Sequence, residues 1–345
     1  MRTCDTPVIA RWSAISPIGR TAEQTGFFLR AGQSQIRWAP FIDEWGERLR
    51  MAYVPYVDTT LTGVGRLLAL VREALAPLLG DFDGSLLIAI AVPERFASKP
   101  LQMELNGDGQ QFAKGLTEYF AGKTGQVKLE LFPCGRAGGA LVLQRAAEWL
   151  KSSPSGSVIA GGVDSYYDWS VLEQLQRQDR VLTEDNIDGF VPGEGAAFLA
   201  LSGDTMHDTV ARVVGLGSGV EPASLLSRKA SKAVGITNAM NAASALLRSS
   251  FVQSRYWLID LTHEMYGIKE FQTVIARFGD IMGTNSVIDT PLREIGNMGA
   301  ATLPLFAALA CESWAQGYAP DRVCVASAGS DNGLRGVLVL EQSAV

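Results

Sequence analysis

The sequence predicts an α/β fold made of two similar halves that share one packed body. The 345 residues are 47% hydrophobic and only 19% charged, which is enough apolar material for a large buried core. The 36 glycines suit an α/β protein in which backbones approach each other closely. Apolar runs of strand length alternate with segments of helical periodicity, and this order occurs twice along the chain. The length suits about two domain-sized units, which we expect at residues 1–203 and 204–345.

Run length and periodicity predict the elements of the first half. The run SLLIAIAV at 85–92 is apolar throughout, which is typical of a strand covered on both faces of a sheet. Thr21 is placed to cap a helix that carries Phe27 and Phe28. The remaining strands are expected at 7–12, 49–55, 127–132, 157–162 and 195–201, and the remaining helices at 61–79, 109–122 and 137–151.

The second half repeats this order from about residue 205, without a literal sequence repeat. The segment GNMGAATLPLFAALACESW at 296–314 predicts a helix led by glycine and small residues. The other elements expected are strands at 211–219, 256–261, 322–328 and 336–342 and helices at 236–250 and 264–278.

Composition also argues against several classes of protein. The net charge of -6 and the lack of a long Lys or Arg run give no electrostatic footprint for nucleic acid. No apolar stretch reaches the length of a membrane span, and the opening residues lack the pattern of a signal peptide. We therefore expect a cytoplasmic protein with no nucleic-acid or membrane partner.

The cysteines and histidines narrow the chemistry further. The four cysteines form no CxxC pair and lie far apart, so we expect reduced thiols and neither a zinc site nor a disulfide framework. These cysteines are Cys4, Cys134, Cys311 and Cys324. There are two histidines, His263 and His207, and the second lies in a polar stretch where we expect a surface residue.

Cys134 lies between a predicted buried strand and a predicted helix, in LFPCGRAGGALVLQ. The N-terminus of a helix stabilises a thiolate through its dipole and its free N–H groups, and the thiolate is the reactive form. The position therefore suits a nucleophile. The alternative is a small, inert cysteine buried at the end of a strand.

Four segments together resemble the β-ketoacyl synthase family of condensing enzymes, and they span nearly the whole chain. They are VIARWSAISPIG near the N-terminus, AGGVDS at 160–165, DGFVPGEGAAFLAL at 188–201 and the tail VCVASAGSDNGLRGVLVLE. The resemblance implies a thiolase-like, five-layered αβαβα fold with two duplicated halves. It also implies a homodimer that takes an acyl group from coenzyme A or an acyl carrier protein, without a metal or redox cofactor.

The resemblance also suggests which residues carry the chemistry. Cys134 takes the place of the nucleophile when the two sequences are aligned on the cysteine-glycine pair, whereas alignment on the following helix and AGGVD places Arg136 there. Arginine stays protonated and cannot attack a thioester, so the second alignment implies a non-condensing relative. His263 or Thr262 falls at the position of the first supporting residue, and Asn297 at that of the second. The alternative roles are a helix-capping histidine and an Asn cap.

Several nearby polar residues have a structural interpretation. We expect Glu194 to hold a loop near the site and Asp164 to support a turn. Glu264 and Glu270 are expected to be carboxylates on a helix surface. The glycines of ASAGSDNG are expected to be turn residues, although the resemblance would let their N–H groups face a thioester carbonyl.

Three functions remain open at this point. The favoured one is a condensing acyltransferase in which Cys134 is acylated while His263 and Asn297 stabilise the enolate and the oxyanion. The second is a catalytically silent ketosynthase-like partner subunit of the chain-length-factor type. The third is a thiolase-like hydrolase or an acyl-transfer enzyme that does not condense.

Overall fold

The computed structural model describes most of the chain, and Cys4 and His207 lie outside the described residues. The described residues are 6–43, 46–80, 85–121, 127–153, 156–203, 209–227 and 229–343.

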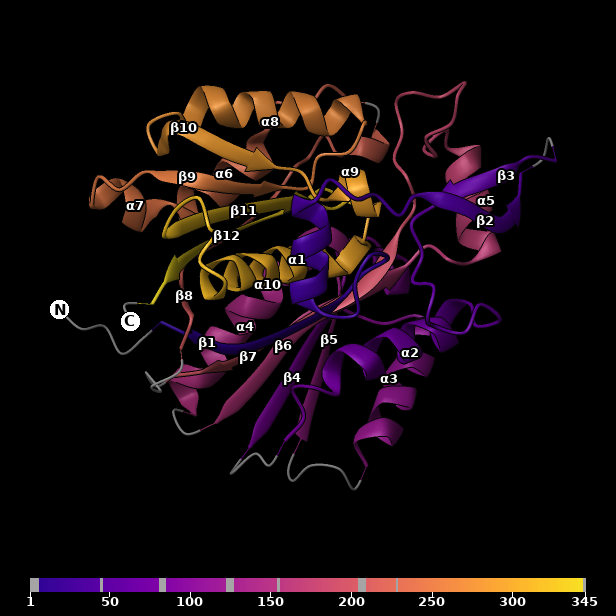
Figure 1. The fold of residues 1–345 in the computed structure, drawn as a ribbon, viewed down its shortest axis with the longest axis horizontal. Coiled ribbons are helices and arrows are strands. Elements are labelled where there is room, and N and C mark those ends of the chain that lie inside the picture. Colours follow the sequence, from indigo (N-terminus) through magenta and orange to yellow (C-terminus); the bar gives the residue numbers. More distant parts are fainter. Residues whose placement is uncertain are drawn as a thin grey trace.

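The first half contains strands and helices in the predicted alternation (Figure 1). Its strands are β1 (Val8–Ile15), β2 (Arg37–Ile42), β3 (Arg48–Met51), β4 (Leu86–Val92), β5 (Val127–Pro133), β6 (Ser157–Ser165) and β7 (Glu194–Ser202). Its α-helices are α1 (Ala22–Arg30), α2 (Gly63–Leu75), α3 (Gly107–Phe120), α4 (Gly138–Ser152) and α5 (Trp169–Arg177). Thr21 caps α1 as predicted, because its Oγ1 accepts a hydrogen bond from the backbone N–H of Gln24 at 3.1 Å.

The second half has the same kind of alternation. Its strands are β8 (Ala211–Val220), β9 (Ser254–Ile259), β10 (Met282–Asp289), β11 (Val323–Gly329) and β12 (Leu334–Gln342). Its α-helices are α6 (Val234–Ala243), α7 (Ala245–Ser249), α8 (Met265–Phe278), α9 (Leu292–Ile295) and α10 (Thr302–Ala315). The predicted helix at 236–250 is therefore two helices, since the chain breaks its helical path at Ser244.

The sheet topology shows the duplication directly. The strand order is β1-β7-β6-β4-β5 in the first half and β8-β12-β11-β9-β10 in the second. In both halves the first three strands pair antiparallel and the last three pair parallel. A short pairing of Val8 and Ile9 in β1 with β8 joins the two halves into one ten-stranded sheet.

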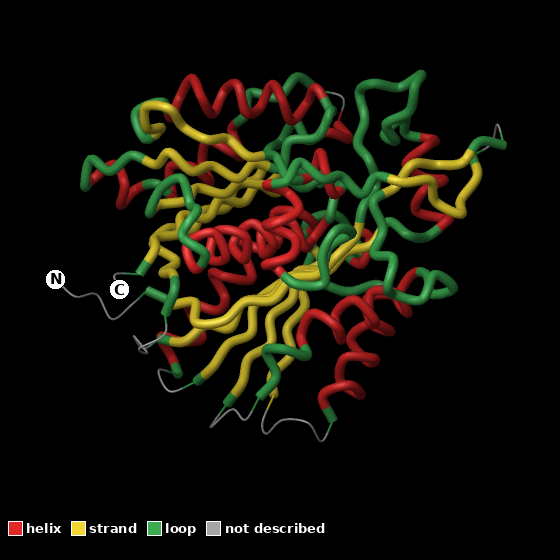
Figure 2. Tube along the Cα trace, viewed as in Figure 1, coloured by secondary structure: helices red, strands yellow, loops and turns green. Residues whose placement is uncertain are grey.

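Helices form the layers inside and outside this folded sheet. Figure 2 shows helices between the two stacks of strands, and these are α4 and α10, whose residues pack against strands of both halves. Helices α2 and α3 cover the outer face of the first half, and α6 and α8 cover that of the second. The result is the αβαβα order of layers that the resemblance implies. In the described part of the chain, no helix is both long and apolar enough to cross a membrane.

Strands β2 and β10 and helices α5 and α9 were not predicted. Strand β10 lies at an edge of the sheet and most of its side chains are exposed or half-buried, so it lacks the apolar run that marked the inner strands. Strands β2 and β3 form a separate two-stranded sheet that packs against α5, where the sequence predicted only a strand at 49–55.

Candidate functional site

The turn between β5 and α4 decides which side chain enters the centre of the molecule. Cys134 ends the strand region, and a 3-10 turn at Gly135–Ala137 leads into α4. Gly135 has φ = 63°, and a Cβ at this position would lie 2.5 Å from the Glu94 side chain. Only glycine meets both demands without strain. The turn thereby points the next residue, Arg136, into a cavity where the two halves meet.

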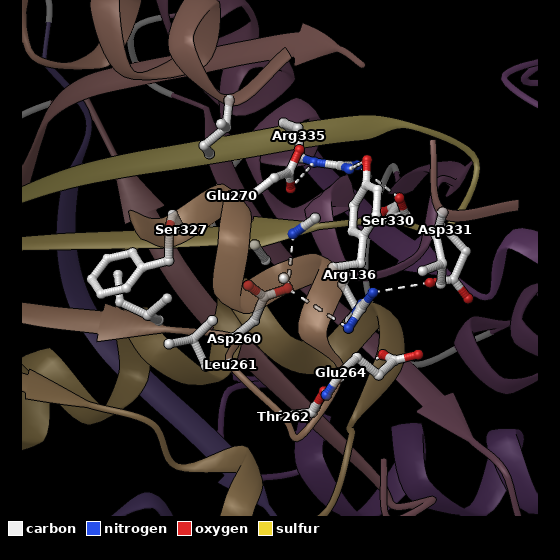
Figure 3. A pocket seen from close by; sticks show the side chains of 18 of the residues that line it. Arg136, Asp260, Leu261, Thr262, Glu264, Glu270, Ser327, Ser330, Asp331 and Arg335 are labelled. Atoms are coloured by element: carbon white, nitrogen blue, oxygen red, sulfur yellow. Dashed lines mark hydrogen bonds and ion pairs between the residues drawn. The ribbon is translucent and has the colours of Figure 1, made fainter. Parts of the chain in front are cut away.

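Arg136 lies in a network of buried ion pairs (Figure 3). Its Nη2 lies 2.9 Å from Oδ1 of Asp331, and its Nη1 lies 3.8 Å from Oδ2 of Asp260. Asp331 also binds Arg180, which in turn forms a 2.9 Å ion pair with Glu264. Three carboxylates therefore share two guanidinium groups. Asp260 directly follows β9, and Asp331 lies in the turn before β12. Arg136 lies in the turn before α4, and Arg180 lies in the loop after α5.

The charge states follow from this arrangement. Burial opposes charge on Arg136, but Asp331 and Asp260 outweigh it and hold the pKa of the guanidinium above its usual value. Burial alone would raise the pKa of Asp331, but Arg180 and Arg136 lower it below its usual range. At Asp260 and Glu264 burial dominates, so the pKa of each carboxyl is raised. The two arginines therefore stay charged, and Asp260 and Glu264 bind a proton more readily than Asp331 does.

Arg136 and Asp331 line two pockets. The first is a small cavity of about 50 Å³ that reaches from Arg136 past Asp260 and Thr262 to apolar side chains of α6 and α8. The second is larger, about 580 Å³, and is bounded on one side by α5 and its following loop. The Arg136–Asp331 ion pair therefore stands where the two pockets come together.

Cys134 lies beside this site and is not among the residues that line either pocket. Its side chain is 3% exposed, and its Sγ lies 3.8 Å from Sδ of Met103. Burial, with a smaller effect from the nearby Glu94 carboxyl, raises the pKa of the Cys134 thiol to about 12. A thiol with this pKa is almost entirely protonated at neutral pH.

The other two predicted site residues also lie away from the cavity wall. The His263 side chain is exposed between β9 and α8. The part of it that is covered, together with the nearby Arg293 guanidinium, lowers the pKa of the imidazole. Thr262, the alternative at that position, is buried and lines the cavity. Asn297 is 1% exposed, and its Oδ1 accepts a hydrogen bond from the N–H of Gly299 at 2.9 Å. This is the geometry of a cap on the turn that leads into α10.

The structure corrects the interpretation of two glutamates. Glu264 and Glu270 were expected on a helix surface, but they are only 7% and 9% exposed. Glu264 pairs with Arg180, and Oε2 of Glu270 lies 2.8 Å from Nε of Arg335. Both point inward because each has a buried arginine to neutralise it, which helical periodicity does not reveal.

The structural interpretations of Glu194 and Asp164 agree with the geometry. Glu194 forms a fully buried ion pair with Arg66 and also accepts hydrogen bonds from Ser165 Oγ and the N–H of Val54, each at 2.6 Å. Asp164 forms a 2.9 Å ion pair with Arg95 and accepts a 3.0 Å hydrogen bond from the N–H of Ala300.

The glycine-rich tail forms a turn that is bound to both halves. The N–H of Gly329 donates to Oδ2 of Asp260 at 2.8 Å, so this N–H is already engaged. Glu94, at the end of β4, accepts hydrogen bonds from the N–H groups of Asp331 and Asn332 at 2.8 and 2.9 Å. Burial and the Asp331 carboxylate raise the pKa of Glu94 to about 8. Glu94, Arg180 and Asp331 were not predicted. Glu94 follows an apolar strand, Asp331 lies in the glycine-rich tail, and Arg180 lies in a charged stretch that gives no signal of burial.

Comparisons with known proteins agree with the fold. No family model matches the sequence, and no curated protein matches it. Among solved structures, the ishigamide ketosynthase/chain length factor is 19% identical, with a TM-score of 0.71, and the match covers 98% of this chain and 100% of that one. A β-ketoacyl synthase from Burkholderia phymatum STM815 is 17% identical, with a TM-score of 0.72, covering 99% and 100%. The type II polyketide ketosynthase complex AntDE:AntF, with its acyl carrier protein, is 14% identical, with a TM-score of 0.74, covering 99% and 100%. The chain has the fold of ketosynthases and chain length factors, so the predicted thiolase-like αβαβα fold is confirmed.

Proposed function

We propose that this chain is a ketosynthase-fold subunit that does not condense acyl groups itself and instead pairs with a synthase, in the manner of a chain length factor. The observation that carries the proposal is the orientation of Arg136, whose guanidinium occupies the central cavity and is bound by Asp331 and Asp260. The alignment on the following helix and AGGVD places Arg136 at the nucleophile position of the family. A guanidinium at that position cannot form a thioester.

The surroundings of Arg136 support the same proposal. Thr262 lines the cavity where a condensing enzyme would need an imidazole, and His263 is turned to solvent. A threonine hydroxyl cannot carry the positive charge with which an imidazolium stabilises a developing enolate. Among the described residues, the site therefore holds a network of ion pairs and has neither a thiolate nor an imidazole beside Arg136.

The free edge of β5 is the surface through which we propose that the subunit pairs. Strand β5 ends the sheet and pairs on one side with β4, and most of its side chains are half-buried. Such an edge, with Leu129 and Leu131 only partly covered, favours pairing with a strand of another subunit. For a silent subunit the partner would be a synthase of the same fold, and the predicted homodimer remains the alternative.

A second candidate is the condensing acyltransferase with Cys134, His263 and Asn297 as its catalytic residues. The specific observation in its favour is that Cys134 lies at the strand-to-helix turn, immediately before the central cavity, and that its backbone carbonyl is bound by Ser330. An acyl thioester of coenzyme A or of an acyl carrier protein would be its substrate. A small rotation of the turn would be required to bring the thiol into the cavity.

Intact-mass analysis distinguishes the two candidates. The purified chain is incubated with acetyl-, malonyl- and octanoyl-coenzyme A and with the corresponding acyl carrier protein thioesters, and its mass is followed over time. The silent subunit should gain no acyl mass. An adduct that is lost in Cys134→Ala but kept in Cys324→Ala, a matched change of another buried cysteine, would establish the condensing candidate instead.

The proposed pairing surface has its own test. Sedimentation velocity is measured for the chain alone and for the chain co-expressed with a ketosynthase, each with the native sequence and with Leu129→Asp. A charge on the free edge should abolish association while leaving the monomer folded. Association that is unaffected by Leu129→Asp would move the interface away from β5.

A further inference from the structure

A third pocket, which shares no lining residue with the two beside Arg136, lies next to helices α1 and α10. Helix α1 lies across α10 (Figure 1), and the two helices contact each other. Beside their crossing is a pocket of about 550 Å³, lined by residues of α1, of the end of α10 and by Tyr318. Its walls combine aromatic rings with carboxylates.

The aromatic wall is built from Phe27, Phe28 and Tyr318. Phe27 and Phe28 are 58% and 36% exposed, and their rings meet edge to face with centroids 5.5 Å apart. The side of α1 that packs on the core carries Ala22, Thr25 and Gly26, so parts of both phenylalanine rings remain exposed. Gly26 also makes room for the third ring, because a Cβ there would lie 2.6 Å from the Tyr318 hydroxyl.

A buried carboxylate without a cationic partner forms another wall. Glu312 is 6% exposed, and its oxygens accept hydrogen bonds from Trp12 Nε1 at 2.9 Å and from Gln316 Nε2 at 3.0 Å. Both donors are neutral. Within the described residues, no Lys, Arg or His nitrogen forms an ion pair with Glu312. Burying a carboxylate in this way is costly unless a positive charge completes the site.

The charges that line the pocket are unequal. Glu23 and Glu312 are negative, and Arg30 is the cation among the lining residues. The Arg30 guanidinium lies 3.6 Å from the centroid of the Tyr318 ring, so this ring face is already covered by a cation and the rings of Phe27 and Phe28 are the ones left for a ligand. One negative charge in the pocket remains unmatched.

We propose that this pocket binds a small organic ammonium cation, with its alkyl groups against the rings of Phe27 and Phe28 and its charge toward Glu312. Aromatic faces attract alkylammonium groups through the quadrupole of the ring, and a nearby carboxylate adds direct attraction. A neutral ligand would leave the carboxylate unmatched, and an anion would be repelled. The site is separate from Arg136 and does not depend on the function proposed for the centre of the molecule.

Isothermal titration calorimetry with choline tests the site, and the uncharged analogue 3,3-dimethyl-1-butanol serves as the matched ligand. Choline should bind with one site per chain, and the neutral analogue should bind at least about tenfold more weakly. Phe27→Ala should weaken choline binding about two- to fivefold. Phe251→Ala removes a phenylalanine that is 95% exposed elsewhere, and it should leave choline binding unchanged.

Glu312→Gln should weaken choline binding at least about tenfold. Because Glu312 also accepts a hydrogen bond from Trp12, this variant is used only if its urea unfolding midpoint matches that of the native chain. Phe27 and Phe28 are exposed, so the alanine variants of these two residues test the site in any case. Equal affinity for choline and its neutral analogue would overturn the proposal. So would choline binding that Phe27→Ala and Phe28→Ala leave unchanged, or no measurable choline binding by the folded native chain.

Discussion

Replacing Arg136 by methionine tests whether the ion-pair network holds the two halves together. Methionine has a similar length and flexibility but no charge, so the change removes the interactions with Asp331 and Asp260 and creates little empty space. The bond to Asp331 is 2.9 Å long and the contact with Asp260 is 3.8 Å. The Arg136 side chain is 11% exposed, so the pair is shielded from solvent on most sides.

The expected loss of stability depends on the hydrogen-bond and ion-pair partners that Asp331 and Asp260 keep when Arg136 is replaced. Breaking a fully buried ion pair typically costs about 3–5 kcal/mol, and breaking an exposed pair costs about 0–1 kcal/mol. Asp331 is 24% exposed and keeps its bonds to Arg180, and Asp260 keeps the N–H of Gly329. We therefore expect Arg136→Met to lower the free energy of unfolding by about 2–3 kcal/mol at pH 7.

Urea unfolding at several pH values measures this loss, and Arg248→Met at the more exposed pair with Asp280 is the control. The folded-state pKa of Asp331 is depressed, so the stability it contributes is present above its unfolded pKa and disappears as the pH falls below it. The loss caused by Arg136→Met should therefore shrink between pH 7 and about pH 3, on the acid side of the unfolded aspartate pKa. A loss no larger than that of the control, or one independent of pH, would refute this account.

Three further predictions concern single residues of the site. Because burial and Asp331 raise the pKa of Glu94 to about 8, the folded state binds this proton more tightly than the unfolded chain, and stability should fall as the pH rises from the usual glutamate pKa toward 8. Glu94→Gln should flatten that part of the urea-unfolding profile by up to about 1.4 kcal/mol per pH unit, and an unchanged slope would contradict the assignment. Asn297→Ala should lower the free energy of unfolding by about 1 kcal/mol in thermal melts, because a turn cap is lost, and should leave any acyl adduct unchanged. Normal stability with altered acylation would instead favour a catalytic role. Cys134 should react with iodoacetamide slowly but faster than Cys311 or Cys324, whose pKa values burial raises further, and peptide mapping that shows the opposite order would reject this ranking.

Much of the fold could be predicted because its signals are local. The run at 85–92 contains β4, whose side chains are all buried, and Thr21 caps α1 through its own side chain. Strand β10 could not be recognised, because a strand at the edge of a sheet needs no apolar run. Helix α5 was missed although its apolar face packs on β2 and β3, since its two buried residues, Leu172 and Leu175, are too few for a periodic signal.

The candidate site was predictable only in part. The strand-to-helix turn at Cys134 was found, and Arg136 and Thr262 were recognised as the alternatives to Cys134 and His263. The partners of Arg136 could not be found, because Asp260 and Asp331 come from the second half of the chain and carry no pattern of their own. Charged residues in a sequence are usually expected at the surface, and burial becomes visible only when the opposite charge is placed beside them.

The sequence by itself determined the alternation of strands and helices, the duplication of their order and the place where β5 turns into α4. These properties depend on hydrophobic periodicity and on neighbouring residues, so they can be read along the chain. Which side chain of that turn enters the cavity was decided only by the tertiary structure. The positive φ of Gly135 turns the backbone so that Arg136 meets Asp331, 195 positions further along the chain, while Cys134 remains buried beside Met103. The direction of a side chain at a tight turn depends on the backbone path and on charges brought together by folding.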